Sequence, residues 1–313
     1  MNQPIRSYED LRGPLSRRLH RVRRALAWRV KSTARRPAHI LVETRWRLGD
    51  EIMAIPIYEG LKRAYPDSRL SVWSAYPELL AGNPFIDQLV VSERAAMVIP
   101  CDRYILLRGA PRDVFRLEHY ARCAGIPTPE ANPRLYFDNW ECASAAGIRG
   151  EGSSFIAVST GASWPTKRWP TAQWQELCQT LEAEGHRVVQ VGKDDEAAGA
   201  RVSLMNRTSL WETACILRAA KLLICCDSGL MHLALAAGTP VLALFGPTTP
   251  SILIREGAAC ESVANGRPCG GCWNVSQEMT EPGVCPRGIA PCMETIAVAA
   301  VLERVRECLG RAR

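Results

Sequence analysis

The chain has 313 residues, enough for two domains of ordinary size, and its composition is 47% hydrophobic and 23% charged. This composition is typical of a globular protein with room for a real core. No apolar run approaches the ~18 residues that a membrane-spanning helix needs, which excludes an ordinary membrane span. The first forty residues lack the apolar stretch of a secretory signal, so we expect a cytoplasmic protein.

The net charge of +7 is concentrated in an N-terminal arm, residues 1–37, which hold 11 of the 39 Lys and Arg residues and 2 of the 32 acidic ones. Leucine and valine recur there at steps of three and four, with arginines between them, which predicts a basic amphipathic helix. Such a helix suits an anionic membrane surface. It would also fit a helix packed on its own protein with a solvated basic face. Nucleic acid is a poorer partner, because no recognition motif is present.

Past the arm, apolar segments that predict strands alternate with segments of helical periodicity. In the first half, the predicted strands are 39–43, 69–73, 88–91 and 103–107, a turn at 49–51 precedes a helix over 52–65, and a short helix lies between 132 and 152. In the second half, the predicted strands are 155–158, 187–191, 221–226 and 241–245, and the predicted helices are 171–185, 208–220, 231–237 and 296–309. This alternation implies parallel sheets joined by crossover helices.

We therefore expect an α/β protein with two Rossmann-like, doubly wound domains that face a central cleft. The predicted organisation is the arm at 1–37, a first domain at 38–150, a second domain at 151–295 and a C-terminal helix at 296–313. Ligands of open parallel sheets bind beyond the carboxyl ends of the strands. Asp50, Thr160 and Asp227 each follow such an end, which favours one shared site.

Two strand-to-helix turns in the second half have the composition of a phosphate site. In the turn Asp227-Ser228-Gly229, the helix N-terminus offers unpaired N–H groups, glycine lets an anion approach the backbone, and serine adds a donor. Small hydroxylated residues and a glycine also follow the strand that ends before Thr160, and Lys167 adds a positive charge for a leaving diphosphate. The alternatives are a serine that only caps its own helix and an ordinary surface loop.

Asp50 is the candidate general base in the first half. It lies among apolar neighbours in Leu48-Gly-Asp-Glu-Ile-Met-Ala-Ile-Pro56, so burial would raise its proton affinity. The alternative is an N-cap aspartate that holds the helix after it.

Taken together, these segments resemble glycosyltransferase family 9, the ADP-heptose heptosyltransferases of bacterial lipopolysaccharide assembly. The matching segments are Leu48-Gly-Asp-Glu-Ile-Met-Ala-Ile-Pro56, Leu61-Lys-Arg-Ala-Tyr-Pro66, Thr160-Gly-Ala, Lys167-Arg-Trp-Pro170, Asp227-Ser-Gly-Leu-Met-His232 and Phe245-Gly-Pro-Thr248. Their order and spacing cover nearly everything from 38 to 300. The resemblance implies the GT-B fold, an N-terminal acceptor domain, a C-terminal domain for the nucleotide-sugar donor, and inverting transfer without a catalytic metal.

The resemblance also assigns roles to matching positions. Asp50 is the general base and Lys167 contacts the donor phosphates. The remaining donor-binding positions are Thr160 and Gly161 in the first phosphate loop, Asp227, Ser228 and Gly229 in the second, His232 on the helix that follows, and Glu196 for the ribose. Glu196 also fits a solvated turn, and His232 also fits a core residue that orients its own turn. Arg45, Arg47 and Arg108 are candidates to meet an acidic acceptor, because guanidinium pairs well with carboxylate and phosphate, and the alternative for each is an ordinary surface arginine.

Four of the thirteen cysteines form a cluster at Cys269, Cys272, Cys285 and Cys292. Four thiolates favour tetrahedral zinc or iron, although the spacing is not that of a standard zinc ribbon. The cluster resembles one in family relatives that glycosylate autotransporter proteins, where the cysteines look like an iron-holding structural finger. Reduced thiols or disulfides are the alternatives, the latter disfavoured by a reducing cytosol.

The sequence thus predicts a cytoplasmic, peripherally membrane-associated transferase of heptose from ADP-heptose to a lipid-linked or glycan acceptor such as lipopolysaccharide. A protein acceptor is the alternative within this class. An epimerase-like nucleotide-sugar enzyme and a metal-stapled scaffold that binds nucleotide-sugar without turnover are the others.

Overall fold

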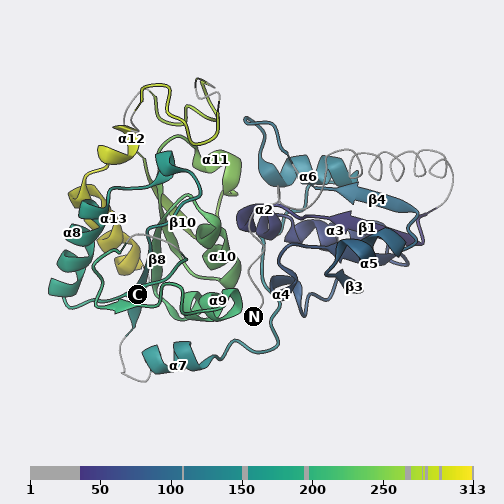
Figure 1. The fold of residues 1–313 in the computed structure, drawn as a ribbon, viewed down its shortest axis with the longest axis horizontal. Coiled ribbons are helices and arrows are strands. Elements are labelled where there is room, and N and C mark those ends of the chain that lie inside the picture. Colours follow the sequence, from purple (N-terminus) through teal and green to yellow (C-terminus); the bar gives the residue numbers. More distant parts are fainter. Residues whose placement is uncertain are drawn as a thin grey trace.

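The computed structural model describes residues 36–107, 109–149, 154–193, 197–264, 269–276, 278, 281–288 and 291–311. The predicted arm helix, Arg108 and Glu196 lie outside these residues. Within them the chain forms two parallel α/β units side by side, the first at the right and the second at the left of Figure 1.

The first unit is a four-stranded parallel sheet of order β3-β2-β1-β4. Its strands are β1 (His39–Glu43), β2 (Arg69–Trp73), β3 (Gln88–Val90) and β4 (Arg103–Leu106). Its helices are α2 (Leu48–Met53), α3 (Ile55–Ala64), α4 (Pro77–Leu80), α5 (Glu93–Val98) and α6 (Arg116–Ala124). Apolar residues alternate between the two faces of β1: Ile40 and Val42 pack in the larger core with α3 and α6, while Leu41 packs with α5.

The second unit is a six-stranded parallel sheet of order β10-β9-β8-β5-β6-β7. Its strands are β5 (Phe155–Ser159), β6 (Arg187–Gln190), β7 (Val202–Ser203), β8 (Leu222–Cys226), β9 (Val241–Phe245) and β10 (Cys260–Ala264). Its helical elements are α7 (Ala143–Arg149), the 3₁₀ turn η2 (Pro165–Lys167), α8 (Thr171–Ala183), α9 (Leu210–Ala219), α10 (Gly229–Ala237), α11 (Pro250–Leu253), α12 (Pro291–Glu294) and α13 (Val298–Arg311). Strands β5, β8 and β9 are buried along their whole length, which explains their continuous apolar sequences.

Both faces of the second sheet are covered. Ile156 and Val158 of β5 pack in one core with α8 and α13, whereas Ala157 belongs to the core that includes α9 and α10. That second core is continuous with the larger core of the first unit. The two units therefore share one apolar body, and the carboxyl ends of β1, β5 and β8 meet along their junction.

Helix α2 of the first unit packs directly against α10 of the second (Figure 1). A Cβ atom added at Gly49 would lie 2.7 Å from Cδ2 of His232, and one added at Gly229 would lie 2.9 Å from Cβ of Leu48. Real side chains do not tolerate such distances, so the close approach of the two helices requires glycine at both positions. The N-terminal turns of the two helices are thereby brought together.

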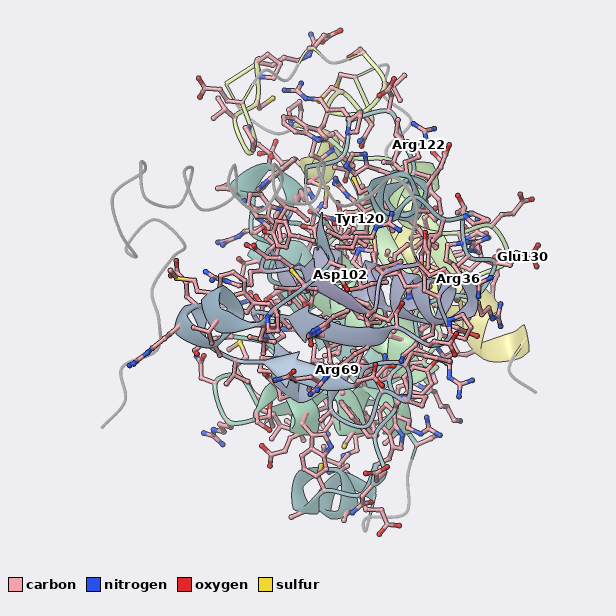
Figure 2. All side chains as sticks on the ribbon, turned by 90° about the vertical axis from the view of Figure 1, so that its right-hand side faces the viewer. Arg36, Arg69, Asp102, Tyr120, Arg122 and Glu130 are labelled. Carbon is pink, nitrogen blue, oxygen red and sulfur yellow. The ribbon has the colours of Figure 1, made fainter. Side chains whose placement is uncertain are left out.

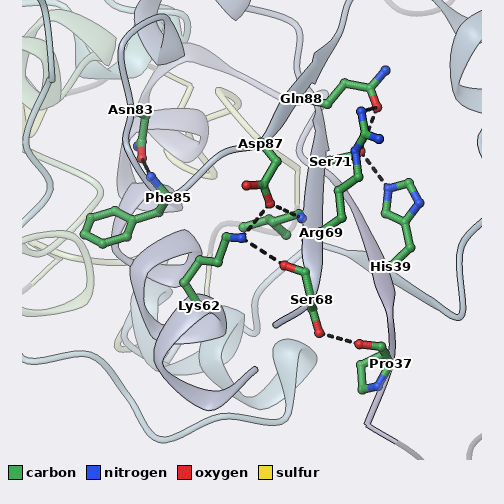
Figure 3. A network of polar contacts seen from close by, with 11 residues as sticks. Pro37, His39, Lys62, Ser68, Arg69, Ser71, Asn83, Phe85, Asp87 and Gln88 are labelled. Carbon is green, nitrogen blue, oxygen red and sulfur yellow. Dashed lines mark hydrogen bonds and ion pairs between the residues drawn. The ribbon is translucent and has the colours of Figure 1, made fainter. Parts of the chain in front are cut away.

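A polar network fixes the end of the first sheet that lies away from this junction (Figure 3). Lys62 of α3 pairs with Asp87 at 2.6 Å and donates to the Ser68 carbonyl oxygen at 2.9 Å, while Asp87 accepts from the Leu70 N–H at 2.6 Å. His39 and Ser71 are hydrogen-bonded across β1 and β2 at 2.8 Å. These contacts fix the positions of α3 and β2 relative to β1. Strand β1 leads into α2, the helix that contains Asp50.

One sequence prediction in this region is wrong. The predicted turn at 49–51 and helix over 52–65 are instead two helices, α2 and α3, which meet at Ala54. Pro56 occupies the first turn of α3, where its missing N–H costs no helical hydrogen bond, and this favours a new helix start there. Strands β7 and β10 were not predicted, since β7 has two residues and the edge strand β10 has few apolar ones.

Candidate active site

Asp50 lies within α2 and is not an N-cap residue. The N-cap position is Arg47, and no side chain makes a capping hydrogen bond there. Asp50 is therefore not needed to begin its helix, and the capping alternative for this residue is excluded. Its carboxyl side chain is 12% exposed.

Two residues of α6, one turn apart, hold the Asp50 carboxylate. The Tyr120 hydroxyl donates to Asp50 Oδ1 at 3.0 Å, and Arg116 Nε lies 3.4 Å from the same oxygen. Burial raises the pKa of Asp50 above its ordinary value, even though Arg116, Tyr120, Arg47 and Lys167 all favour the charged form. A carboxylate with raised proton affinity is suited to accept a proton. Sequence reasoning missed Tyr120 and Arg116, because their spacing is that of any helix face.

Figure 2 views the molecule from the side of the first sheet. Arg122 of α6 projects outward there, and its side chain is 61% exposed. Tyr120 is 1% exposed, so its hydroxyl is held in place by packing as well as by Asp50.

Glu51, the neighbour of Asp50, turns into the protein and anchors α2. The Thr44 hydroxyl, just past β1, donates to Glu51 Oε1 at 2.5 Å. Burial raises the pKa of Glu51 to about 8, against hydrogen bonds from Ser74, Thr44 and the Ala75 backbone. This side chain is 1% exposed, so it fixes the helix rather than facing a ligand.

Lys167 and Asp227 form a buried ion pair in the second unit. Lys167 Nζ lies 2.6 Å from Asp227 Oδ2, and the Thr248 hydroxyl donates to the same oxygen at 2.7 Å. Burial would raise the pKa of Asp227, but Lys167 and Thr248 outweigh it and hold the pKa below its ordinary value. The predicted positions Lys167 and Asp227 are thus brought together, and Thr248 joins them from the end of the Phe245–Thr248 segment.

Ser228 occupies the N-cap position of α10 without capping it. Its side chain makes no capping hydrogen bond, and Ser228 Oγ is buried with no hydrogen-bond partner among the described residues. A buried hydroxyl without a hydrogen-bond partner lowers the stability of the fold, unless a bound ligand supplies the partner. The arrangement favours the anion-binding interpretation of this turn over the capping one.

His232 lies one turn into α10, with its ring against Gly49. Burial lowers its pKa to about 4, with Lys167 and Arg116 acting in the same direction and Asp227 against it. The ring is therefore neutral at physiological pH and links α10 to α2, the helix that carries Asp50. Thr160, just past β5, is 4% exposed and accepts from Gln190 Nε2 at 3.4 Å, and Gly161 follows it at the same strand end.

The two described arginine candidates lie near this junction but differ in their contacts. Arg47 Nη1 donates to Ser163 Oγ at 3.0 Å and so connects the two units. Arg45 stacks on the Trp73 ring, with Cζ 4.1 Å from the ring centroid.

The four clustered cysteines line one small cavity. Cys269, Cys272, Cys285 and Cys292 share it with Glu278 and Arg287, among others. Burial raises the pKa of Cys292 to about 11, and the other three cysteines add to the effect. The donor set fits a thiophilic metal, yet no group of three or more His, Cys, Asp or Glu side chains in the described part of the chain is arranged as a metal site. The four predicted ligands thus line one cavity, and metal binding by them stays a prediction.

With two parallel Rossmann-like sheets joined at a carboxyl-end site, the molecule has the GT-B fold of glycosyltransferases. The family model described as glycosyltransferase family 9 (heptosyltransferase) matches residues 111–278, more than half of the chain. The chain therefore belongs to glycosyltransferase family 9.

Lipopolysaccharide heptosyltransferase 1 of Pseudomonas aeruginosa is 31% identical over 162 residues, which cover 49% of this chain and 44% of that protein. The chain thus spans less than half the length of that curated relative. The inactive autotransporter heptosyltransferase BimC of Burkholderia thailandensis is 26% identical over 275 residues, 82% of this chain and 61% of that protein. The dodecameric iron-containing heptosyltransferase TibC from enterotoxigenic E. coli, solved in complex with ADP-D-β-D-heptose, superposes with a TM-score of 0.74 at 18% identity, covering 90% of this chain and 78% of that one.

Proposed function

We propose that this chain transfers a heptose from ADP-heptose to an acceptor of the bacterial cell envelope, with inversion at the anomeric carbon. The observation that carries the proposal is the junction itself, where a carboxylate of raised pKa on α2 lies beside a buried Lys167–Asp227 pair and an uncapped helix N-terminus. Family membership and the ADP-heptose-bound relative support the choice of donor.

The reaction uses these groups in one displacement. The acceptor hydroxyl oxygen forms a bond to the anomeric carbon while the bond from that carbon to the diphosphate oxygen breaks. Asp50 accepts the hydroxyl proton, and ADP leaves with the bonding electrons. Lys167, Ser228 Oγ and the N–H groups at the start of α10 stabilise the charge that grows on the diphosphate. Thr160 and Gly161 border the same anion, and Glu196 is assigned to the ribose.

The acceptor is proposed at the level of lipopolysaccharide or another envelope glycan, with Arg45, Arg47 and Arg108 meeting its acidic groups. A protein acceptor is the second candidate. It is favoured by the alignment with an autotransporter heptosyltransferase over 82% of this chain. Because that relative is described as inactive, binding without turnover is the outcome that a test must separate from transfer.

The test is incubation of the full chain with ADP-heptose and each acceptor class, followed by mass spectrometry of the acceptor. A mass increase of one heptose on heptose-deficient lipopolysaccharide supports the first acceptor, and the same increase on an autotransporter passenger protein supports the second. ADP-heptose binding without any product would leave only the binding role. Conversion of the nucleotide-sugar to an isomer would instead indicate an epimerase.

The four cysteines are proposed to hold a structural zinc or iron ion, as their shared cavity and soft donor set suggest. When bound, the metal would cross-link the segment from Cys269 to Cys292 and take no part in sugar transfer. Metal analysis of the purified protein tests this, and less than about a tenth of an equivalent would count against it.

We also propose peripheral attachment to the cytoplasmic face of the membrane through the basic arm at 1–37. None of the described helices is long and apolar enough to cross a membrane. Binding of the full chain to anionic but not neutral vesicles, lost on removal of the arm, is the expected result.

A further inference from the structure

Four side chains form a stack in which two adjacent indole rings lie between two cations. Lys167 Nζ lies 4.2 Å from the Trp164 ring centroid, and the Trp164 and Trp273 rings meet edge to face with centroids 4.9 Å apart. Arg112 Cζ lies 3.7 Å from the centroid of the Trp273 ring. Each contact is of a favourable kind, and together they connect the ammonium of Lys167 to an arginine of the first unit.

Trp273 belongs to the cysteine loop, which is defined here as the described residues of 269–288. The loop is tied to the second unit by hydrogen bonds from the Gly271 and Trp273 N–H groups to the carbonyl oxygens of Gly246 and Pro247, both at 2.8 Å. Its Gly283 lies next to Trp164, because a Cβ added there would be in ordinary van der Waals contact with Trp164 Cβ at 3.4 Å. The cysteine loop thus holds the indole on which Lys167 rests.

The same loop reaches the first unit. Asn274 Nδ2 donates to the Arg112 carbonyl oxygen at 2.6 Å, while Asn274 Oδ1 accepts from the Thr249 N–H at 3.0 Å. One amide therefore bridges the segment after β4 and the segment before α11. Displacement of either unit would disturb the cysteine loop and, through Trp273, the Trp164 ring.

Two further observations describe the surroundings of Lys167. Trp164 Nε1 is buried with no hydrogen-bond partner among the described residues, and it belongs to the ring that Lys167 contacts. Thr166, the neighbour of Lys167, lines the cavity of the four cysteines. In the segment 164–167, Thr166 therefore faces the cysteine cavity, and the next residue, Lys167, faces Asp227.

We propose that Trp273 is a positioning residue for Lys167: through Trp164 it holds the ammonium against Asp227, and through Arg112 it makes that placement depend on the seating of the first unit. A lysine has a flexible four-carbon stem, so a ring that restricts it reduces the freedom lost when an anion binds. The inference rests on the proposed function in that the anion is then the diphosphate of the donor.

The first experiment needs no ligand. The full chain is labelled briefly with acetic anhydride, and acetylation of each lysine is measured by peptide mass spectrometry. In Trp273→Leu we expect Lys167 to be acetylated about fivefold faster, a change in the range of an ordinary cation–π contact. Trp273→Phe keeps an aromatic edge and should react like the wild type. Lys62, whose pair with Asp87 also measures 2.6 Å, is the internal control for general loosening.

The second experiment measures ADP affinity by calorimetry. Trp273→Leu should weaken ADP binding about fivefold, and this effect should vanish in a Lys167→Ala background if Trp273 acts through the lysine. Arg134→Ala is the matched control, because it removes another arginine–aromatic contact, that of Arg134 on the Tyr136 ring at 4.7 Å.

The outcomes separate the two proposals. Unchanged Lys167 acetylation in Trp273→Leu, or an equal rise at Lys62, would overturn the positioning role whatever the protein binds. A wild type that does not bind ADP would contradict the proposed donor, while the labelling result would still decide the role of Trp273. An equal loss of ADP affinity in both backgrounds would show that Trp273 acts independently of Lys167 and would also overturn it.

Discussion

The two halves of the molecule each place an aspartate at a strand end, and they treat it in opposite ways. Asp50 is paired with Arg116 at 3.4 Å and with a tyrosine hydroxyl, and burial raises its pKa. Asp227 is more deeply buried, yet Lys167 at 2.6 Å and Thr248 hold its pKa down. Each carboxylate has one cation and one hydroxyl donor, so the shorter distance to the cation, 2.6 Å against 3.4 Å, decides the difference. One carboxylate is therefore ready to take a proton, while the other stays charged and holds a lysine.

Replacement of the proton acceptor should break this comparison most severely. Asp50→Asn is expected to lower sugar transfer by about 100-fold or more, as loss of a general base does, while ADP binding persists. Kinetics and calorimetry on the same preparation measure the two effects. The exposed residue Asp67 supplies the control variant Asp67→Asn, which should leave transfer unchanged. Near wild-type transfer by Asp50→Asn would remove Asp50 from the role of base.

Removal of Lys167 should show that Asp227, unlike Asp50, depends on its cation to stay charged. Lys167→Met leaves a buried carboxylate without its cation, so we expect the free energy of unfolding at neutral pH to fall by about 3 kcal/mol. Because the pKa of Asp227 is depressed in the wild type, its stabilising contribution is present above the ordinary pKa of 3.8 and is lost as the pH falls through the folded value.

In the variant, the pKa of Asp227 should rise, so acidification should restore part of the lost stability. Urea unfolding between neutral and acidic pH measures this. Lys62→Met is the control, because its partner Asp87 is 38% exposed and solvent already screens that pair. Equal destabilisation by the two variants would contradict the special status of the Lys167–Asp227 pair.

The tyrosine beside Asp50 should tune the base without abolishing it. Tyr120→Phe removes a donor that favours the charged carboxylate, so the pKa of Asp50 should rise further. The acid limb of the kcat/KM profile should then move up by about one pH unit, because Asp50 must be ionised to act. Tyr104→Phe removes a tyrosine–carboxylate hydrogen bond to Glu43 elsewhere in the first unit and should leave the limb in place. A shift towards lower pH would contradict the assignment.

The smallest effect is expected where the two halves touch at the surface. Arg47→Ala removes the exposed hydrogen bond to Ser163, so the free energy of unfolding should change by no more than about 0.5 kcal/mol. The KM for an acidic acceptor should rise, while that for its neutral analogue should not. An equal rise for both acceptors would show that Arg47 does not recognise acceptor charge.

Much of the fold follows from local sequence patterns. The buried strands β1, β5, β8 and β9 have continuous apolar runs, and the segments after β1 and β8 contain the Gly-Asp and Asp-Ser-Gly residues of the candidate base and the candidate phosphate turn. These features depend on residues within a few positions of each other. The break between α2 and α3 was missed because the helical periodicity continues across Ala54 and only the start at Pro56 marks it.

What the sequence alone determined is therefore the alternation of strands and helices, two candidate anion-binding turns and the candidate base. Tertiary structure alone decided that Tyr120 and Arg116 meet Asp50, that Gly49 and Gly229 let α2 and α10 touch, and that Trp273 reaches Trp164. These contacts join residues far apart in the chain, and their energies depend on burial and direction. A local pattern contains neither quantity, because both arise only when separate segments pack together.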